Sequence, residues 1–165
     1  MKNKKNNFGF TLIEIVVVTA AVGIIMVAII GVVISTLKLQ NQTKSSSKVV
    51  SGGNKILSEL KKNVLNSNKG SISCNGTSSI TLTNNYDGNL TEINCANNKI
   101  ASISARETVY LNSGDIVVVD CSQFVSCSTL PSLEMGDVNF KFGIGATVSG
   151  VGITQNFEMD VTVRN

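Results

Sequence analysis

The chain has 165 residues and a formal net charge of +3, and this excess comes from three lysines among its first five residues. Beyond them, 11 Lys and Arg (14 less 3) balance 11 Asp and Glu, so a strongly basic nucleic-acid-binding domain is not indicated. The chain contains no His and no C-x2-C unit, which argues against a zinc site and against Ser-His catalysis. We therefore predict no enzyme activity, no metal site and no cofactor.

Residues 1–9 form a short basic leader in which Lys2, Lys4 and Lys5 are mixed with Asn. Lysines in front of a membrane span stay on the cytoplasmic side and direct the following chain across the membrane. No small-x-small cleavage site follows the apolar run, so the pattern differs from an ordinary secretory signal. We predict a single-pass membrane protein with a cytoplasmic N-terminus and a periplasmic or extracellular C-terminal domain.

Residues 10–37 predict a membrane-spanning helix. Glu14 is the only charged residue in this segment, and Ile15 to Leu37 supply 23 uncharged residues. Such a run is long enough to cross a hydrocarbon core of roughly 30 Å. A carboxylate at the edge of the membrane costs about 2.5–3.5 kcal/mol on insertion scales. We therefore expect Glu14 to have a partner.

Residues 38–66 continue the same helix, now with a narrow apolar stripe on a polar surface. The members of the stripe recur at helical spacing, and they are Val49, Ile56, Leu57, Leu60 and Val64. This amphipathic half needs a sheet to cover. Gly52-Gly53 weakens the helix, so we expect a bend or a short melted stretch there. Ser67-Asn68-Lys69-Gly70 predicts the end of the helix.

Residues 67–165 change to the period of β-strands and predict a β-rich exported domain. Apolar alternation predicts strands at 80–83, 90–95, 100–104, 109–111, 116–121, 138–144 and 157–163. A turn is expected at 84–89, and a glycine-rich loop at 145–152 would join the last two strands into a hairpin. The predicted fold is α+β, with a long N-terminal helix packed on a C-terminal antiparallel β-sheet.

Four cysteines lie in the predicted exported domain: Cys74, Cys95, Cys121 and Cys127. Their even number in an oxidising compartment predicts two disulfides. Short spacing along the chain favours the local pairs Cys74–Cys95 and Cys121–Cys127, although all three connectivities remain open. Free buried thiols are the main alternative.

Gly9 followed by Phe10-Thr11-Leu12-Ile13-Glu14, between a Lys-rich leader and an apolar helix, resembles the class III signal of bacterial type IV pilins and type II secretion pseudopilins. Beyond about residue 66 the resemblance is architectural only. It implies cleavage between Gly9 and Phe10 by a prepilin peptidase, N-methylation of Phe10 and a role for Glu14 in assembly. It also implies other pilin-like subunits, an inner-membrane assembly platform and, before assembly, membrane lipid as partners.

A physical role for Glu14 accompanies this resemblance. Cleavage would leave an ammonium group on Phe10, and the ammonium of a neighbouring subunit would offset the cost of Glu14 in apolar surroundings. Thr11 and Glu14 also fit a capping box, in which Glu14 serves the start of its own helix. Small residues four apart either loosen the helix or admit a neighbouring helix. They are Thr19, Gly23, Gly31 and Ser35.

The sequence thus predicts the precursor of a structural subunit, a minor pilin or pseudopilin, of a type IV pilus or type II secretion-like filament. One alternative is a DNA-capturing pilin of a natural-transformation apparatus, although nucleic acid is not an expected partner. Such a pilin needs a basic strip on its outer domain, for which the candidates are Lys99, Arg106, Lys141 and Arg164. Another alternative is a signal-anchored surface protein, an enzyme or adhesin, whose N-terminus is only a tether.

Overall fold

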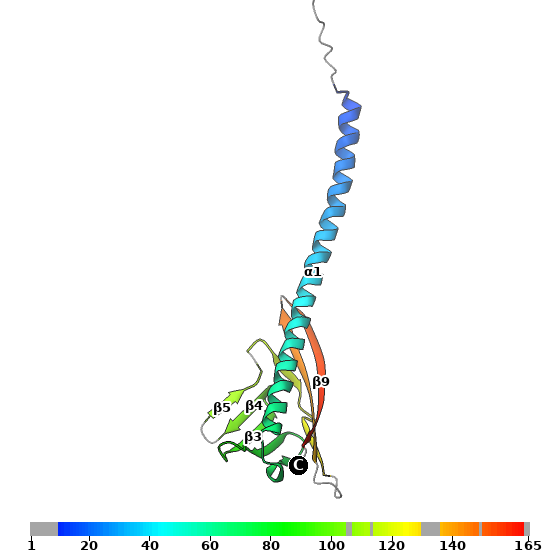
Figure 1. Ribbon diagram of the computed structural model, residues 1–165. Helices are drawn as coiled ribbons and strands as arrows, with labels where there is room; N and C mark the ends of the chain where they lie inside the picture. Colours follow the sequence, from blue (N-terminus) through cyan, green and yellow to red (C-terminus); the bar gives the residue numbers. More distant parts are fainter. Residues whose placement is uncertain (1–9, 105–106, 113, 130–135, 149, 164–165) are drawn as a thin grey trace, which may run out of the picture. The chain divides into compact units, whose positions relative to one another are not determined.

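The computed structural model describes residues 10–104, 107–112, 114–129, 136–148 and 150–163 (Figure 1). Within these residues there is one α-helix, α1 (Leu12–Leu65), of 54 residues, followed by nine strands. The chain divides into two compact units, an N-terminal unit of residues 1–40 and a head unit of residues 41–165. Each unit therefore contains one part of α1. The α+β class predicted from the sequence is confirmed.

The strands of the head unit form two antiparallel sheets rather than the single sheet expected. The five-stranded sheet consists, in spatial order, of β1 (Ser73–Asn75), β2 (Ser79–Thr83), β3 (Leu90–Ala96), β4 (Lys99–Ser104) and β5 (Glu107–Tyr110). In the four-stranded sheet, β8 (Gly136–Val148) pairs along its whole length with β9 (Val151–Val163). The other edge of β8 pairs with β6 (Val117–Asp120) and β7 (Val125–Thr129). A short 3-10 helix, η1 (Lys69–Ser71), precedes β1.

The second part of α1 packs against the sheets through the predicted apolar stripe. Leu57 is partly buried, and the other members, Val49, Ile56, Leu60 and Val64, are fully buried. Aromatic rings fill much of the core. The rings of Phe124 and Phe140 lie 5.7 Å apart, and Phe142 stacks on Phe157 at 5.8 Å between centroids. In Figure 1 the second part of α1, in the head unit, runs between β3–β5 on one flank and β9 on the other.

The melted stretch expected as one possibility at Gly52-Gly53 is absent, because α1 is helical at both positions, and the bend stays a prediction. A Cβ atom added to Gly53 would overlap the ring of Phe157, and one added to Gly52 would overlap the side chain of Ile116. The two glycines therefore let the helix approach the sheets closely. The packing gained offsets the roughly 1 kcal/mol that each glycine costs the helix relative to Ala.

The loop expected at residues 145–152 is also wrong. Ladder pairing of β8 and β9 continues through Gly145↔Thr154 to Val148↔Val151, so a tight turn rather than a long loop joins the strands. Gly150, with φ +79°, supplies the left-handed conformation that this turn requires. Glycine is needed at positions 143 and 145 for another reason. A Cβ atom on Gly143 or Gly145 would lie only 3.0–3.1 Å from the Val119 side chain of β6. Gly143 and Gly145 therefore make room for the neighbouring strand β6 and do not form a turn.

Other boundaries differ in smaller ways. The turn at 84–89 is confirmed between β2 and β3. The helix ends at Leu65, where the Ser67 hydroxyl donates to the Val64 carbonyl at 2.6 Å, so Gly70 is not its cap and lies in η1 instead. Strands β1 and β7 were not predicted, because each is short and rich in Ser and Cys.

Candidate functional site

The helix begins two residues after Phe10. The backbone N–H of Glu14 donates to the Thr11 carbonyl at 3.1 Å and lies 3.4 Å from the Thr11 hydroxyl oxygen. Thr11 therefore caps the first turn, as one half of the expected capping box. The reciprocal half, in which the Thr11 N–H would donate to the Glu14 carboxylate, is not formed among the described residues.

Glu14 projects from the first turn of α1 and is exposed. Within the described part of the chain, no hydrogen bond or ion pair reaches its carboxylate. Phe10, Glu14 and Val18 are four residues apart and line one shallow hollow on the helix surface, together with Ile15 and Thr19. The structure thus brings two of the three predicted N-terminal site residues, Phe10 and Glu14, to the same face. The third, Gly9, lies outside the described residues.

The helix around this hollow exposes an apolar surface on all sides. Every large apolar side chain from Phe10 to Leu39 is between 47% and 82% exposed. Soluble monomers rarely expose contiguous apolar patches of more than a few hundred Å². The segment is long and apolar enough to cross a membrane. Such a surface needs a cover that the N-terminal unit does not itself provide, and both lipid and other apolar helices can supply it.

Three hydroxyl groups of this segment are satisfied within the helix. The hydroxyls of Thr19, Ser35 and Thr36 each donate to a carbonyl three or four residues earlier, at 2.9–3.0 Å. Polar groups paired in this way tolerate an apolar environment. A Cβ added at Gly23 or Gly31 would meet nothing within 4 Å in this chain, and the helix continues through both. The predicted loosening at Gly31 is therefore not observed, while a packing role for these small residues stays a prediction.

All four cysteines form disulfides, but the favoured local pairing is wrong. The bonds are Cys74–Cys127 and Cys95–Cys121, with Cα–Cα distances of 6.0 and 5.7 Å. Cys74 and Cys95 lie on strands of the five-stranded sheet, whereas Cys127 lies on β7 and Cys121 directly follows β6. Each bond therefore joins one sheet to the other, as expected of an exported domain in an oxidising compartment.

Strand geometry explains why the local pairs cannot form. Cys74 on β1 and Cys95 on β3 are separated by the intervening β2, which places these two strands about 10 Å apart. In the second local pair, Cys121 follows Asp120, which is opposite Gly143, whereas Cys127 is opposite Val138. Gly143 and Val138 are about 17 Å apart along β8. Both separations exceed the reach of a disulfide, whose Cα atoms lie within about 7 Å.

Of the four residues that a DNA-capturing pilin would need, the two that the structure describes, Lys99 and Lys141, lie on different sheets. Lys99 on β4 lies over the ring of Tyr110, with its nitrogen 4.5 Å from the centroid. Lys141 lies on β8 opposite Glu158, in the other sheet. Arg106 and Arg164 lie outside the described residues.

Comparison with known proteins adds no relative. No family model, no curated protein and no solved structure matches this chain.

Proposed function

We propose that this chain is the precursor of a structural subunit of a type IV pilin-like filament, in a pilus or a type II secretion-like system. The observation that carries the proposal is Glu14, an acid that is exposed and unpaired among the described residues, in the first turn of α1 and directly before the 23 uncharged residues Ile15 to Leu37. It stands five residues after Gly9 in the motif Gly9-Phe10-Thr11-Leu12-Ile13-Glu14, which resembles the prepilin signal. In a simple membrane tether this acid would serve only as a cap of its own helix, and its carboxylate makes no capping bond among the described residues.

In this proposal, a prepilin peptidase cuts between Gly9 and Phe10 and removes all three leader lysines. The new ammonium group on Phe10 then lies one helical turn from Glu14 along the same face. Because that carboxylate is unpaired within the described chain, it is available to the ammonium of a neighbouring subunit. The positive end of the neighbour's helix dipole adds to the attraction.

Each subunit then offers one cation and one anion at different heights. Their pairing sets a fixed axial stagger between neighbours, and a contact of this head-to-tail kind that does not close generates a helical filament. Apolar helices would replace lipid as the cover of the N-terminal unit when the subunit leaves the membrane. The disulfide-linked head unit would face the outside and carry contacts with other subunits of the filament.

The proposal is tested by replacing Glu14. Glu14→Ala should be cleaved normally but incorporated into filaments on the order of a hundredfold less, because the neighbour's ammonium loses its partner in apolar surroundings. Thr36→Ala is the matched control, since that hydroxyl pairs only with its own helix at Val32. Incorporation is measured by blotting sheared filaments. Equal incorporation of Glu14→Ala and wild type would overturn the pairing.

Processing is tested separately at Gly9. Gly9→Leu should accumulate as the longer precursor, because a bulky side chain blocks the close approach of the peptidase to the backbone. Gly23→Leu lies inside the helix and should be processed as in the wild type. Normal shortening of Gly9→Leu would favour the tether alternative.

A further inference from the structure

Four lysines form one line along the head-unit part of α1. They follow one another at intervals of 4, 7 and 7 residues, and they are Lys44, Lys48, Lys55 and Lys62. At 100° per residue this spacing places them within a sector of about 40°, over a length of about 27 Å. All four are exposed. We call this line the lysine stripe.

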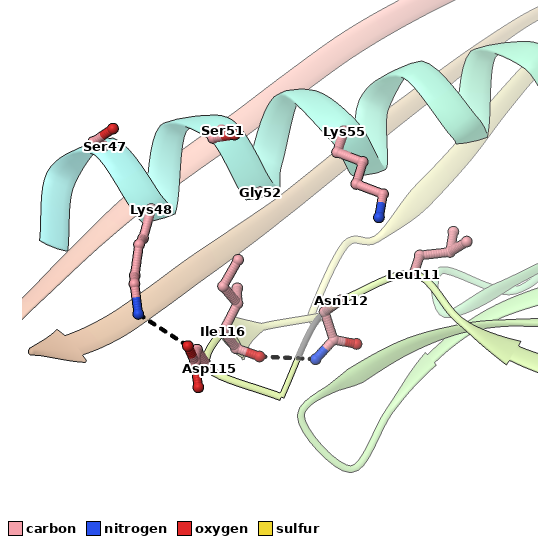
Figure 2. A pocket seen from close by; sticks show the side chains of 9 residues that line it. All are labelled: Ser47, Lys48, Ser51, Gly52, Lys55, Leu111, Asn112, Asp115 and Ile116. Atoms are coloured by element: carbon pink, nitrogen blue, oxygen red, sulfur yellow. Dashed lines mark hydrogen bonds and ion pairs between the residues drawn. The ribbon is translucent and has the colours of Figure 1, made fainter. Parts of the chain in front are cut away.

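Part of the charge of the stripe is already balanced. Lys48 pairs with Asp115 at 2.9 Å, from the loop before β6, and Figure 2 shows Lys55 on the same side of the helix with no partner drawn. Glu59 lies beside the stripe, one turn from Lys55. Four lysines less these two acids leave two positive charges. Among the described residues, no ion pair or hydrogen bond engages the side chains of Lys44, Lys55 or Lys62.

An acidic surface lies on the outer face of the four-stranded sheet. Glu158 and Asp160 on β9 are exposed, and both accept hydrogen bonds from the Asn139 amide, at 3.2 and 2.7 Å. Asp120 at the end of β6 lies beside Gly143 on the same face. These three exposed acids and one base, Lys141, leave two negative charges, and we call them the acidic face.

The two surfaces cannot meet within one chain. Phe157 and Val161 on β9 point into the core, on the side of the sheet that α1 covers. Glu158 and Asp160 alternate with them and point to the opposite side of the sheet. A contact between the lysine stripe and the acidic face therefore needs two molecules. Because it joins different surfaces of the two copies, it is a contact that can repeat without closing.

We propose that the lysine stripe of one copy docks on the acidic face of a second copy of this chain. The inference rests on the proposed filament function and adds to it. It implies that copies of this chain lie next to one another in the filament, rather than as isolated minor subunits. The two surfaces carry opposite net charges, and the Asn139 amide already holds two carboxylates in place. A polyanion such as nucleic acid fits the stripe less well, because Asp115 and Glu59 would repel it.

The test reverses charges in the full-length chain in its own cells. A photo-crosslinking amino acid at Ser51, which is exposed beside the stripe, reports the neighbour. Lys55→Glu with Lys62→Glu, or Glu158→Lys with Asp160→Lys, should lower crosslinking between copies about tenfold, because like charges then face each other. All four substitutions together should restore it, since each contact again joins opposite charges.

Lys61→Glu with Lys99→Glu is the matched control. It changes the net charge as much as the stripe variant does, at exposed positions away from the stripe. Absence of free thiols on alkylation checks that every variant is folded. The proposal is overturned if neither double variant loses crosslinks, if the quadruple variant does not recover, or if the crosslinks at Ser51 lead to nucleic acid or lipid.

The outcome can be separated from that of the proposed function. If charge variants assemble like the wild type while Glu14→Ala does not, the docking contact fails and the filament function stands. If wild-type crosslinks form between copies that still retain Met1, the filament function fails and the docking contact stands.

Discussion

The two parts of α1 face opposite surroundings although they belong to one helix. In the N-terminal unit Val27 is 72% exposed and no side chain of the apolar run is buried, whereas in the head unit Ile56 and Leu60 are fully buried. The first part is apolar all round and the second is apolar along one stripe. The difference teaches that the head unit folds around its own core, while the N-terminal unit depends on lipid or on other chains.

The largest expected effect on stability distinguishes the core of the head unit from the N-terminal unit. Phe142→Ala removes a ring that is 1% exposed and stacked on Phe157, so the free energy of unfolding of the head unit should fall by about 3–5 kcal/mol. Val33→Ala, in the apolar run and 51% exposed, should leave it unchanged. Urea denaturation of the full chain in detergent, followed by near-ultraviolet circular dichroism, measures both. A comparable loss in Val33→Ala would mean that the N-terminal unit contributes to the folded core.

Breaking the links between the sheets should have the next largest effect. Cys74–Cys127 spans 53 residues and Cys95–Cys121 spans 26. In the chain-entropy treatment, removal of the first should cost about 4 kcal/mol and removal of the second about 3.5 kcal/mol. Paired Cys→Ala variants and thermal melts give the two values. Disulfide-linked peptides from an unreduced digest check the pairing, and a Cys74–Cys95 peptide would contradict it.

Glycines at matched positions sharpen the comparison further. Gly53→Ala should destabilise the head unit by about 1–3 kcal/mol, because the added methyl group overlaps the Phe157 ring. Gly31→Ala meets nothing within 4 Å and should not change unfolding of the head unit. The same urea titration measures both. If Gly31→Leu also assembles normally, the packing role predicted for this glycine is wrong.

The smallest expected effect is on the thermal stability of the head unit at low pH. The Ser122 N–H donates to the Asp120 carboxylate at 2.9 Å and lowers its pKa below the usual 3.8; the Asn89 N–H does the same for the pKa of Asp87. A lowered folded-state pKa adds stability above the unfolded value, which is lost as pH falls through the folded value. Between about pH 5 and about pH 2, Asp120→Asn should therefore lose less thermal stability than the wild type. An identical pH profile would contradict this.

Helix and strand period allowed much of the fold to be predicted. The apolar stripe from Val49 to Val64 predicted which face of α1 is buried, and alternation predicted most strands. Glycine caused the errors, because Gly53 and Gly145 are needed for close approach to Phe157 and Val119, and a sequence does not reveal such neighbours. The disulfide pairing failed for a related reason, since distance along the chain does not measure distance across strands.

The candidate site was predicted unevenly. Phe10 and Glu14 stand out in the sequence because one acid interrupts a long apolar run. The lysine stripe was not predicted, although its spacing of 4, 7 and 7 is visible in the sequence, because basic residues were sought on the outer domain, at Lys99, Arg106, Lys141 and Arg164. The acidic face could not be predicted, since it depends on how β6 and β9 are placed on either side of β8.

The most direct test of the account is the intact mass of the protein isolated from assembled filaments. The account predicts a chain that begins with N-methylated Phe10 and contains no alkylatable thiol before reduction. A chain that still begins with Met1 would contradict it, because the leader would then remain in front of Glu14 and no ammonium would form at Phe10.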